Sequence, residues 1–337
     1  MLSLEKLRVE EILQQCHGKR IAVVGDVMID RYYWGVVHRI SPEAPVPVVE
    51  VEKESVRFGG AANVANNIQI LGGIPLLVGL VGNDHPGTMF HEMLVEQGME
   101  TTGIVVDGSR PTTMKTRVIA QGQHVVRIDN ESKQECPDHL RHRIIDAVRY
   151  NIHSIDAIIL EDYNKGVITR EVIQEIIAVA VKYKKIVTVD PKFNNFLEYR
   201  NVTVFKPNRR ETEEVLGGRL RTDEDVEVAG KKLLAMLGAE NVLLTRSEQG
   251  MTLVEASGAV THLPSMAHVV QDVSGAGDTV ISTLTLVLAA GATVREASVM
   301  ADCAGGIVVG SVGIVPVLPE QLKEGMINLA LERKGKN

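Results

Sequence analysis

Cysteine is scarce in this chain of 337 residues, and the three that occur, Cys16, Cys136 and Cys303, lie far apart without a CxxC pair. An odd number of widely spaced cysteines excludes a disulfide framework and is typical of free thiols in a reducing compartment. The acidic N-terminus also lacks the apolar stretch of a secretory signal. These absences together predict a cytoplasmic protein.

Long hydrophobic runs and clusters of positive charge are missing as well. The longest uncharged runs, 279–294 and 303–319, are shorter than the roughly 20 residues that a membrane span needs, so we expect no membrane partner. The 36 basic residues are outnumbered by 43 acidic ones, and the net charge of −7 argues against a nucleic-acid partner. A small anionic substrate stays open, because a few local cations are enough to bind it.

Short apolar runs alternate with amphipathic stretches along the whole chain. The runs are continuous and rich in β-branched residues, as in a parallel sheet, whereas 138–152 and 169–181 carry apolar residues at helical spacing. This alternation predicts an α/β fold in which helices cover both faces of a doubly wound, mostly parallel sheet. The predicted strands are 21–25, 76–81, 157–160, 186–189, 202–205 and 242–245.

Charged residues stand directly at the ends of several predicted strands. They are Asp26, Glu161, Asp162, Asp190 and Arg246. Ligands of open α/β sheets lie outside the carboxyl ends of the strands, so these positions are candidates for a binding site. The first strand is followed by GDVMID and not by GxGxxG, which weakens the interpretation as a dinucleotide-binding enzyme.

Two segments, about 31–58 and 112–129, break the alternation. The first has no helical period and contains prolines that suit edge strands or turns, and the second alternates with period two around a turn at 121–123. We expect these pieces to form a small antiparallel β flap, a lid beside the main sheet in one domain spanning residues 1–337. Its exposed strand edges favour pairing with a second flap in a homodimer.

The strongest local motif is DVSGAGD at 272–278, which precedes a long apolar helix. The small residues Gly275, Ala276 and Gly277 leave the N–H groups of the helix start open to an anion, and Asp278 lies in the first turn. One interpretation is an anion hole beside a general base, which suits phosphoryl transfer. The alternative is that Asp278 only complements the helix dipole while the glycines form a turn.

A second glycine motif, GGAANVA, begins at Gly59 and Gly60. An apolar stripe predicts a helix from Ala61 to the glycines at 72–73, with Asn63 in its first turn, where its side chain could point at a ligand. Gly59 and Gly60 would then form a flexible joint between the flap and this helix. The simpler interpretation is a turn with a solvated Asn63, and this motif alone favours it.

Together the two motifs resemble the signatures of the ribokinase family of carbohydrate kinases, also called the phosphofructokinase-B family. The resemblance covers about residues 19–320, and Thr283 departs from it because the general family has a smaller residue there. It implies a ribokinase-like three-layer fold and phosphorylation of a sugar by ATP with Mg²⁺. The matching residues are Gly59, Gly60, Asn63, Ala65, Gly72, Gly82, Asp272, Gly275, Ala276, Gly277 and Asp278.

Longer stretches are similar to one subgroup, the D-glycero-β-D-manno-heptose-7-phosphate kinases of bacterial lipopolysaccharide precursor biosynthesis. This similarity implies phosphorylation at the anomeric O1 to give the 1,7-bisphosphate. Many members carry a C-terminal nucleotidylyltransferase, and because the chain ends at Asn337 we expect the single-function form. A kinase for another sugar and a sugar- or nucleotide-binding protein without catalysis stay open as alternatives. The stretches are 25–35, 39–51, 161–166, 190–192 and 244–251.

The resemblance also implies roles for individual residues. Asp278 would be the general base, and Asp30 would bind sugar hydroxyls unless it is only a turn residue. Glu211 would act on Mg²⁺ through water, and it also suits a capped helix over 208–216 with Asn208 as N-cap. The anion hole would be Gly275, Ala276 and Gly277; the sugar segment Gly59, Gly60 and Asn63; the nucleotide site Asn208, Glu211, Thr245, Arg246 and Gly250; and a K⁺ site Asp272 and Ser274.

A 7-phosphate on the substrate requires cations. Five are candidates: Lys115, Arg117 and Arg127 on the flap, and Lys165 and Lys192 just beyond strand ends. Any single lysine is most often a solvated surface charge. We therefore expect only two or three of the five to bind the phosphate.

Overall fold

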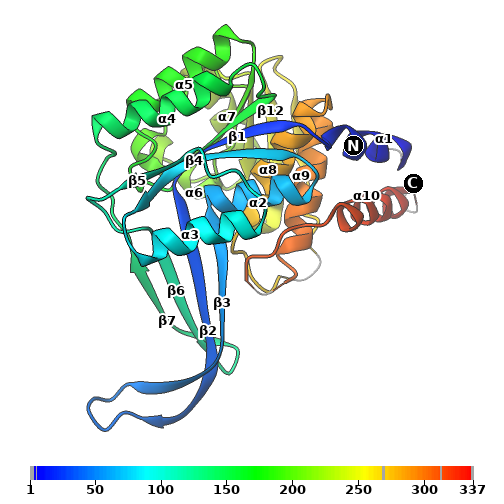
Figure 1. The fold of residues 1–337 in the computed structure, drawn as a ribbon. Helices are drawn as coiled ribbons and strands as arrows, with labels where there is room; N and C mark the ends of the chain where they lie inside the picture. The colour runs from blue at the N-terminus through cyan, green and yellow to red at the C-terminus, as the bar shows by residue number, and fades with distance from the viewer. Residues whose placement is uncertain (1–3, 5, 268–269, 312, 335–337) are drawn as a thin grey trace.

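The computed structural model describes residue 4 and residues 6–267, 270–311 and 313–334. Its main element is a nine-stranded sheet with helices on both faces, as the sequence predicted (Figure 1). The neighbours from β11 to β5 pair in parallel, whereas β12 pairs antiparallel with both β11 and β13. In spatial order the strands are β13 (Val260–Leu263), β12 (Met251–Glu255), β11 (Asn241–Thr245), β10 (Val204–Phe205), β9 (Ile186–Asp190), β8 (Ala157–Glu161), β1 (Arg20–Gly25), β4 (Ile74–Gly82) and β5 (Ile104–Asp107).

Alternate residues of the central strands pack against different helical layers. In β1, Ile21 and Val23 belong to one hydrophobic cluster, and Ala22 and Val24 belong to the other. One layer contains α1 (Lys6–Cys16), α2 (Ala61–Ile70), α3 (His85–Glu96), α8 (Ala276–Ala289), α9 (Val294–Val308) and α10 (Pro319–Lys334); the other contains α4 (Asp138–Asn151), α5 (Arg170–Lys182) and α7 (Asp223–Leu237), with α6 (Arg209–Leu216) following β10.

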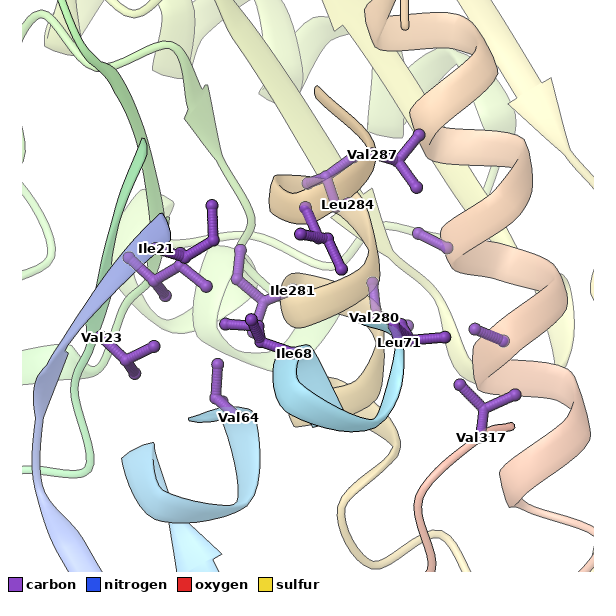
Figure 2. Packing of buried hydrophobic residues seen from close by; sticks show 14 of the residues in the cluster. Ile21, Val23, Val64, Ile68, Leu71, Val280, Ile281, Leu284, Val287 and Val317 are labelled. Atoms are coloured by element: carbon purple, nitrogen blue, oxygen red, sulfur yellow. The ribbon is translucent and has the colours of Figure 1, made fainter. Parts of the chain in front are cut away.

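Helix α8 lies in the centre of its layer. Figure 2 shows Ile281 and Leu284 of α8 near Ile21 of β1 and Ile68 of α2. Every residue of α8 from Asp278 to Leu288 is buried, which explains why no charged residue follows Asp278 in this helix. Among the described residues, no helix combines the length and the apolar character that crossing a membrane would require.

The flap is a second sheet of four strands that projects from the main sheet (Figure 1). Its two hairpins are antiparallel as predicted, and the pair that joins them, β2 with β6, runs parallel. The first hairpin is longer than expected because its strands begin at Val27 and end at Gly60. The strand order is β3 (Pro47–Gly60), β2 (Val27–Ile40), β6 (Met114–Ala120) and β7 (Gln123–Asn130).

Candidate active site

The carboxyl ends of β1, β8 and β9 meet the N-termini of α2 and α8 at one edge of the main sheet. Glu161 is the last residue of β8 and lies in register with Gly25 of β1 and Asp190 of β9. Asp26, directly after β1, accepts hydrogen bonds from the backbone N–H groups of the loop after β8. The charged residues at strand ends therefore gather as the topology of an open α/β sheet predicts.

Asp278 joins the two glycine motifs in space. Its side chain is buried in the first turn of α8, and its Oδ2 accepts a hydrogen bond of 2.8 Å from Asn63 Nδ2 in the first turn of α2. Its Oδ1 accepts a hydrogen bond of 2.6 Å from the Tyr163 hydroxyl. Asn63 is 1% exposed, so the simpler interpretation of a solvated asparagine is wrong.

The chemical state of Asp278 follows from these surroundings. Burial raises the pKa of its carboxyl group to about 6, and Asp190 contributes in the same direction. The hydrogen bonds from Asn63 and Tyr163 and the charge of Lys206 act the other way, because they stabilise the carboxylate. A group with this pKa is ionised at neutral pH and can accept a proton.

The backbone at the start of α8 is built around Gly275, whose φ of 77° lies in the left-handed region that favours glycine. Asp272 holds the preceding turn, since its Oδ1 accepts from Ser274 N–H and its Oδ2 from Gly313 N–H, both at 2.9 Å. Among the predicted anion-hole groups, the Ala276 N–H donates to the Val273 carbonyl at 3.3 Å.

Gly59 and Gly60 were predicted to form a flexible joint, and the structure shows that close packing around them also favours glycine. A Cβ atom at Gly59 would overlap Oδ2 of Asp30, and one at Gly60 would overlap the Asp26 carbonyl. Gly60 also has a φ of 55°. Asp30 is buried in β2 and forms an ion pair with Arg117 of β6. The structure thus brings Asp30, Gly59, Gly60 and Asn63 together at the base of the flap.

Buried charges surround Asp278 on the side of the sheet. Lys206 Nζ lies 2.6 Å from Asp190 Oδ2, and both side chains are buried. Glu161 has no exposed surface, and within the described residues neither carboxylate oxygen has a hydrogen-bond partner. Burial raises the pKa of Glu161 well above its ordinary value, and the carboxylates of Asp190 and Asp278 add to this effect.

The candidate phosphate-binding cations differ in their partners. Lys165 pairs with Glu131 at 2.6 Å, Lys192 with Glu211 at 2.6 Å, and Arg117 with Asp30. Arg127 lies on the exposed strand β7 and pairs with Asp129 at 2.9 Å, outside the group of residues around Asp278. Lys115 has no ion pair with any residue that the structure describes. Its Nζ lies 5.3 Å from the ring centre of Tyr163.

The predicted nucleotide residues cluster around the start of α6. Asn208 caps this helix in a reciprocal pair with Glu211, as predicted, and the Glu211 Oε1 atom faces Lys192. Thr245, at the end of β11, forms a parallel bridge with Asn208. The two segments therefore lie side by side although 37 positions separate them in the sequence.

The loop after Thr245 has strict packing requirements. The Arg246 guanidinium is buried and pairs with Asp223 at 2.6 Å, so its charge is already neutralised within the protein. Gly250 has a φ of 77°, and a Cβ atom there would overlap the Leu263 carbonyl. Gly250 thus allows β12 and β13 to approach the loop.

Tyr163 and Lys206 are site residues that the sequence reasoning missed. Tyr163 stands two positions beyond β8, and Lys206 directly follows β10. The rule that selected Asp26 and Asp190, a polar side chain at the carboxyl end of a strand, also covers both of these positions. A fuller application of that rule would have found them.

Comparisons with known proteins agree with this geometry. The chain matches the pfkB family carbohydrate kinases over residues 19–321. It is 42% identical over 320 residues to the bifunctional protein HldE of Geobacter sulfurreducens, covering 95% of this chain and 65% of the relative. The HldE protein of Helicobacter pylori is 43% identical over 295 residues, covering 88% and 64%. The chain thus spans about 65% of the length of these curated relatives.

Solved structures show the same fold. Escherichia coli phosphofructokinase-2 in complex with potassium has a TM-score of 0.75 at 17% identity, over 93% of this chain and 99% of that one. Arabidopsis thaliana ribokinase complexed with ribose and ATP has a TM-score of 0.72 at 18% identity, over 92% and 99%. The predicted ribokinase-like fold is confirmed. The chain belongs to the pfkB family of carbohydrate kinases, and it is an enzyme that transfers a phosphoryl group to a sugar.

Proposed function

We propose that this kinase transfers the γ-phosphoryl group of ATP to the anomeric O1 of D-glycero-β-D-manno-heptose 7-phosphate in the cytoplasm, giving the 1,7-bisphosphate. The observation that carries the phosphoryl-transfer chemistry is the buried Asp278 carboxylate at the start of α8, held by Asn63 and Tyr163. The choice of sugar is supported by the similarity of stretches 25–35 and 161–166 to the heptose-7-phosphate kinases. The product would serve lipopolysaccharide precursor biosynthesis.

In this mechanism Asp278 accepts the proton of the sugar hydroxyl as O1 attacks the phosphoryl group. Its pKa of about 6 keeps it ionised at neutral pH, where it can act as a base. The helix start at Gly275–Gly277 offers N–H groups and a partial positive charge to the migrating phosphoryl group. Asp30 would accept hydrogen bonds from sugar hydroxyls beside Gly59 and Gly60.

ATP and Mg²⁺ would lie next to the start of α6. When bound with ATP, Mg²⁺ neutralises charge on the phosphates. Glu211 uses Oε2 to cap α6 and pairs with Lys192 through Oε1, so contact with Mg²⁺ through water would have to share an oxygen with one of these partners. Among the described residues no group of three or more His, Cys, Asp or Glu side chains could hold a metal alone, which suits an ion held mostly by phosphates and water.

Lys115 is the strongest of the five candidates for the 7-phosphate. It comes from the flap, its pKa is lowered by burial, and no carboxylate of the described chain pairs with it. A phosphate group beside Lys115 would supply the missing counter-charge. The flap would then close over the sugar and exclude water, which competes with O1 for the phosphoryl group.

A homodimer formed through the flap is part of the proposal. The outer strand β7 is exposed along its whole length, and Val126 and Ile128 present 48% and 56% of their surface to solvent. Pairing with a second flap would cover this strand. Light scattering at micromolar protein should give twice the chain mass of 36.8 kDa, and a single chain mass would contradict the dimer.

A K⁺ ion near Asp272 and Ser274 completes the proposed site. Both Asp272 oxygens already accept backbone N–H bonds, so an ion there would share these oxygens with the turn that leads into α8. If K⁺ binds at this site, kinase activity should rise when K⁺ replaces Na⁺ at equal ionic strength. Equal rates in the two salts would contradict the site.

The test of the proposed function combines a substrate panel with one substitution. ADP release is measured with heptose 7-phosphate, unphosphorylated heptose, fructose 6-phosphate and ribose, and phosphorus NMR locates the new phosphate. We expect the highest kcat/KM for heptose 7-phosphate and a phosphate on O1. Faster turnover of another sugar would overturn the choice of substrate, and ligand binding without any turnover would overturn the kinase activity.

Asp278→Asn tests the mechanism in the same assay. The variant should fold and bind ATP but lose about 10²–10⁴ in kcat, the scale of a general base. Asp146→Asn on α4, where the side chain is 41% exposed, is the control and should keep the full rate. Near-normal turnover of Asp278→Asn would remove Asp278 from the mechanism.

A further inference from the structure

Tyr163 occupies a central position that the proposed mechanism does not explain. Its hydroxyl donates to Asp278 Oδ1 at 2.6 Å. Two cations approach the ring, because Lys115 Nζ lies 5.3 Å and Lys192 Nζ 5.4 Å from the ring centre. A cation over a tyrosine ring is attracted by the negative charge density of the ring face.

The backbone of Tyr163 is fixed as firmly as its side chain. Its N–H donates to Asp26 Oδ2 at 2.8 Å, and the N–H groups of Lys165 and Val167 donate to the same carboxylate at 3.0 and 3.1 Å. Asp26 is 1% exposed, so these hydrogen bonds form away from water. The loop after β8 is thereby held to the end of β1, and these hydrogen bonds fix the backbone position from which the Tyr163 side chain extends.

The direction of the hydrogen bond to Asp278 is settled by charge. Burial and the neighbouring carboxylates of Asp278 and Glu161 raise the pKa of the Tyr163 hydroxyl well above its usual value, so the phenol keeps its proton. Tyr163 therefore donates to Oδ1 while Asn63 donates to Oδ2. Two donors on different elements define the orientation of the carboxylate plane.

We propose that Tyr163 is a positioning residue of the phosphoryl transfer, which orients the Asp278 carboxylate toward the sugar hydroxyl and stabilises its ionised form. This inference rests on the proposed role of Asp278 as the base. The two lysines near the ring link it to other parts of the site, since Lys115 belongs to the flap and Lys192 pairs with Glu211 at the predicted nucleotide site.

The ionised form of Asp278 needs this support because its other neighbours oppose one another. Asp190 at the end of β9 and Glu161 at the end of β8 disfavour a further negative charge. Lys206, directly after β10, and Asn63 of α2 favour it. Without the Tyr163 hydroxyl, one of the groups that stabilise the Asp278 carboxylate is lost, and the pKa of Asp278 rises.

The experiment compares Tyr163→Phe with the intact enzyme in the pH dependence of kcat/KM for the sugar. The variant keeps the ring near both lysines and removes only the hydroxyl. We expect kcat/KM to fall by about tenfold or more at pH 7, and the acidic limb to move upward by about one pH unit, the scale of a hydrogen bond to a charged group. The KM for ATP should stay within about twofold, because Tyr163 reaches the predicted nucleotide residues only indirectly, through Lys192, which pairs with Glu211.

Tyr199→Phe is a matched control. The Tyr199 hydroxyl donates to Asp162 Oδ2 at 2.7 Å and is buried, so this variant also loses one buried tyrosine–aspartate hydrogen bond. It should lower the melting temperature and leave the acidic limb in place. If Tyr163→Phe does not fold, Tyr163→Met, which also lacks a donor, is measured in the same way.

The outcomes separate the inference from the function on which it rests. A Tyr163→Phe enzyme with an unchanged rate and acidic limb, alongside an inactive Asp278→Asn enzyme, overturns the inference and leaves the proposed function intact. A lower rate with an unshifted limb, equal to the effect of Tyr199→Phe, also overturns it, because that is a structural effect. Full activity of Asp278→Asn overturns the proposed function itself.

Discussion

Glu161→Gln should stabilise the protein, and the gain should grow with pH. The wild-type carboxyl group is fully buried at the end of β8, and no described residue donates a hydrogen bond to either oxygen. Its folded pKa lies well above the ordinary value of 4.5, since burial and then Asp190 and Asp278 disfavour the charge. Glutamine has nearly the same shape and carries no ionisable proton.

The sign follows from proton linkage. Between pH 4.5 and the folded pKa, the folded protein keeps a proton that the unfolded chain has released. The stabilising contribution of this proton is fully present below pH 4.5 and is lost as the pH rises through the folded pKa. The advantage of Glu161→Gln therefore increases by up to about 1.4 kcal/mol per pH unit in this window and is constant above it.

Urea unfolding followed by far-UV circular dichroism at pH 5, 6, 7 and 8 measures this difference. Glu52→Gln is the control, because Glu52 is exposed on β3, and its effect should be small at every pH. A difference between Glu161→Gln and wild type that stays constant from pH 5 to 8 would refute the reasoning.

Other predictions concern the substrate cation, the loop after β8 and the base. Lys115→Met should raise the KM for heptose 7-phosphate by roughly tenfold or more, the scale of a lost charge-assisted hydrogen bond, and steady-state kinetics should show a smaller change for unphosphorylated heptose. Asp26→Ala leaves three backbone N–H groups without their acceptor and should cost on the order of 3 kcal/mol in urea unfolding; an unchanged midpoint would contradict this. Because the proposed mechanism requires an ionised Asp278 and its pKa is about 6, kcat/KM should fall as the pH drops through 6, and a profile that stays flat to pH 5 would exclude this base.

The sequence was sufficient for the parts of the molecule that local patterns determine. The buried parallel strands, the hairpin over 112–129 and the start of α2 at Ala61 follow from hydrophobic period and glycine chemistry. The strands β5, β12 and β13 and the helices α1, α3, α7, α9 and α10 were not predicted. The four-residue β5 and β13 are too short for a clear period, and β12 and β13 pair antiparallel at the sheet edge, outside the βαβ alternation that located the other strands.

The sequence predicted many of the residues that belong to the candidate site. It did not predict which of them contact one another. Asp278 and Asn63 were singled out separately, but their 2.8 Å hydrogen bond depends on α2 and α8 packing together in one layer. The five candidate cations could not be ranked for a similar reason. Their ranking depends on carboxylates elsewhere, such as Glu131 for Lys165 and Glu211 for Lys192, and these partners are fixed only by the fold.

The loop after β8 connects three parts of the candidate site. Asp26 anchors the loop to β1, Tyr163 extends from it to Asp278, and Lys165 extends to Glu131 beyond the end of β7. Gly166 allows the close contact, because a Cβ atom there would overlap the Gln134 carbonyl. A displacement of this one loop would therefore move both Tyr163, the partner of the proposed base, and Lys165, whose ion pair with Glu131 reaches the segment after the flap strand β7.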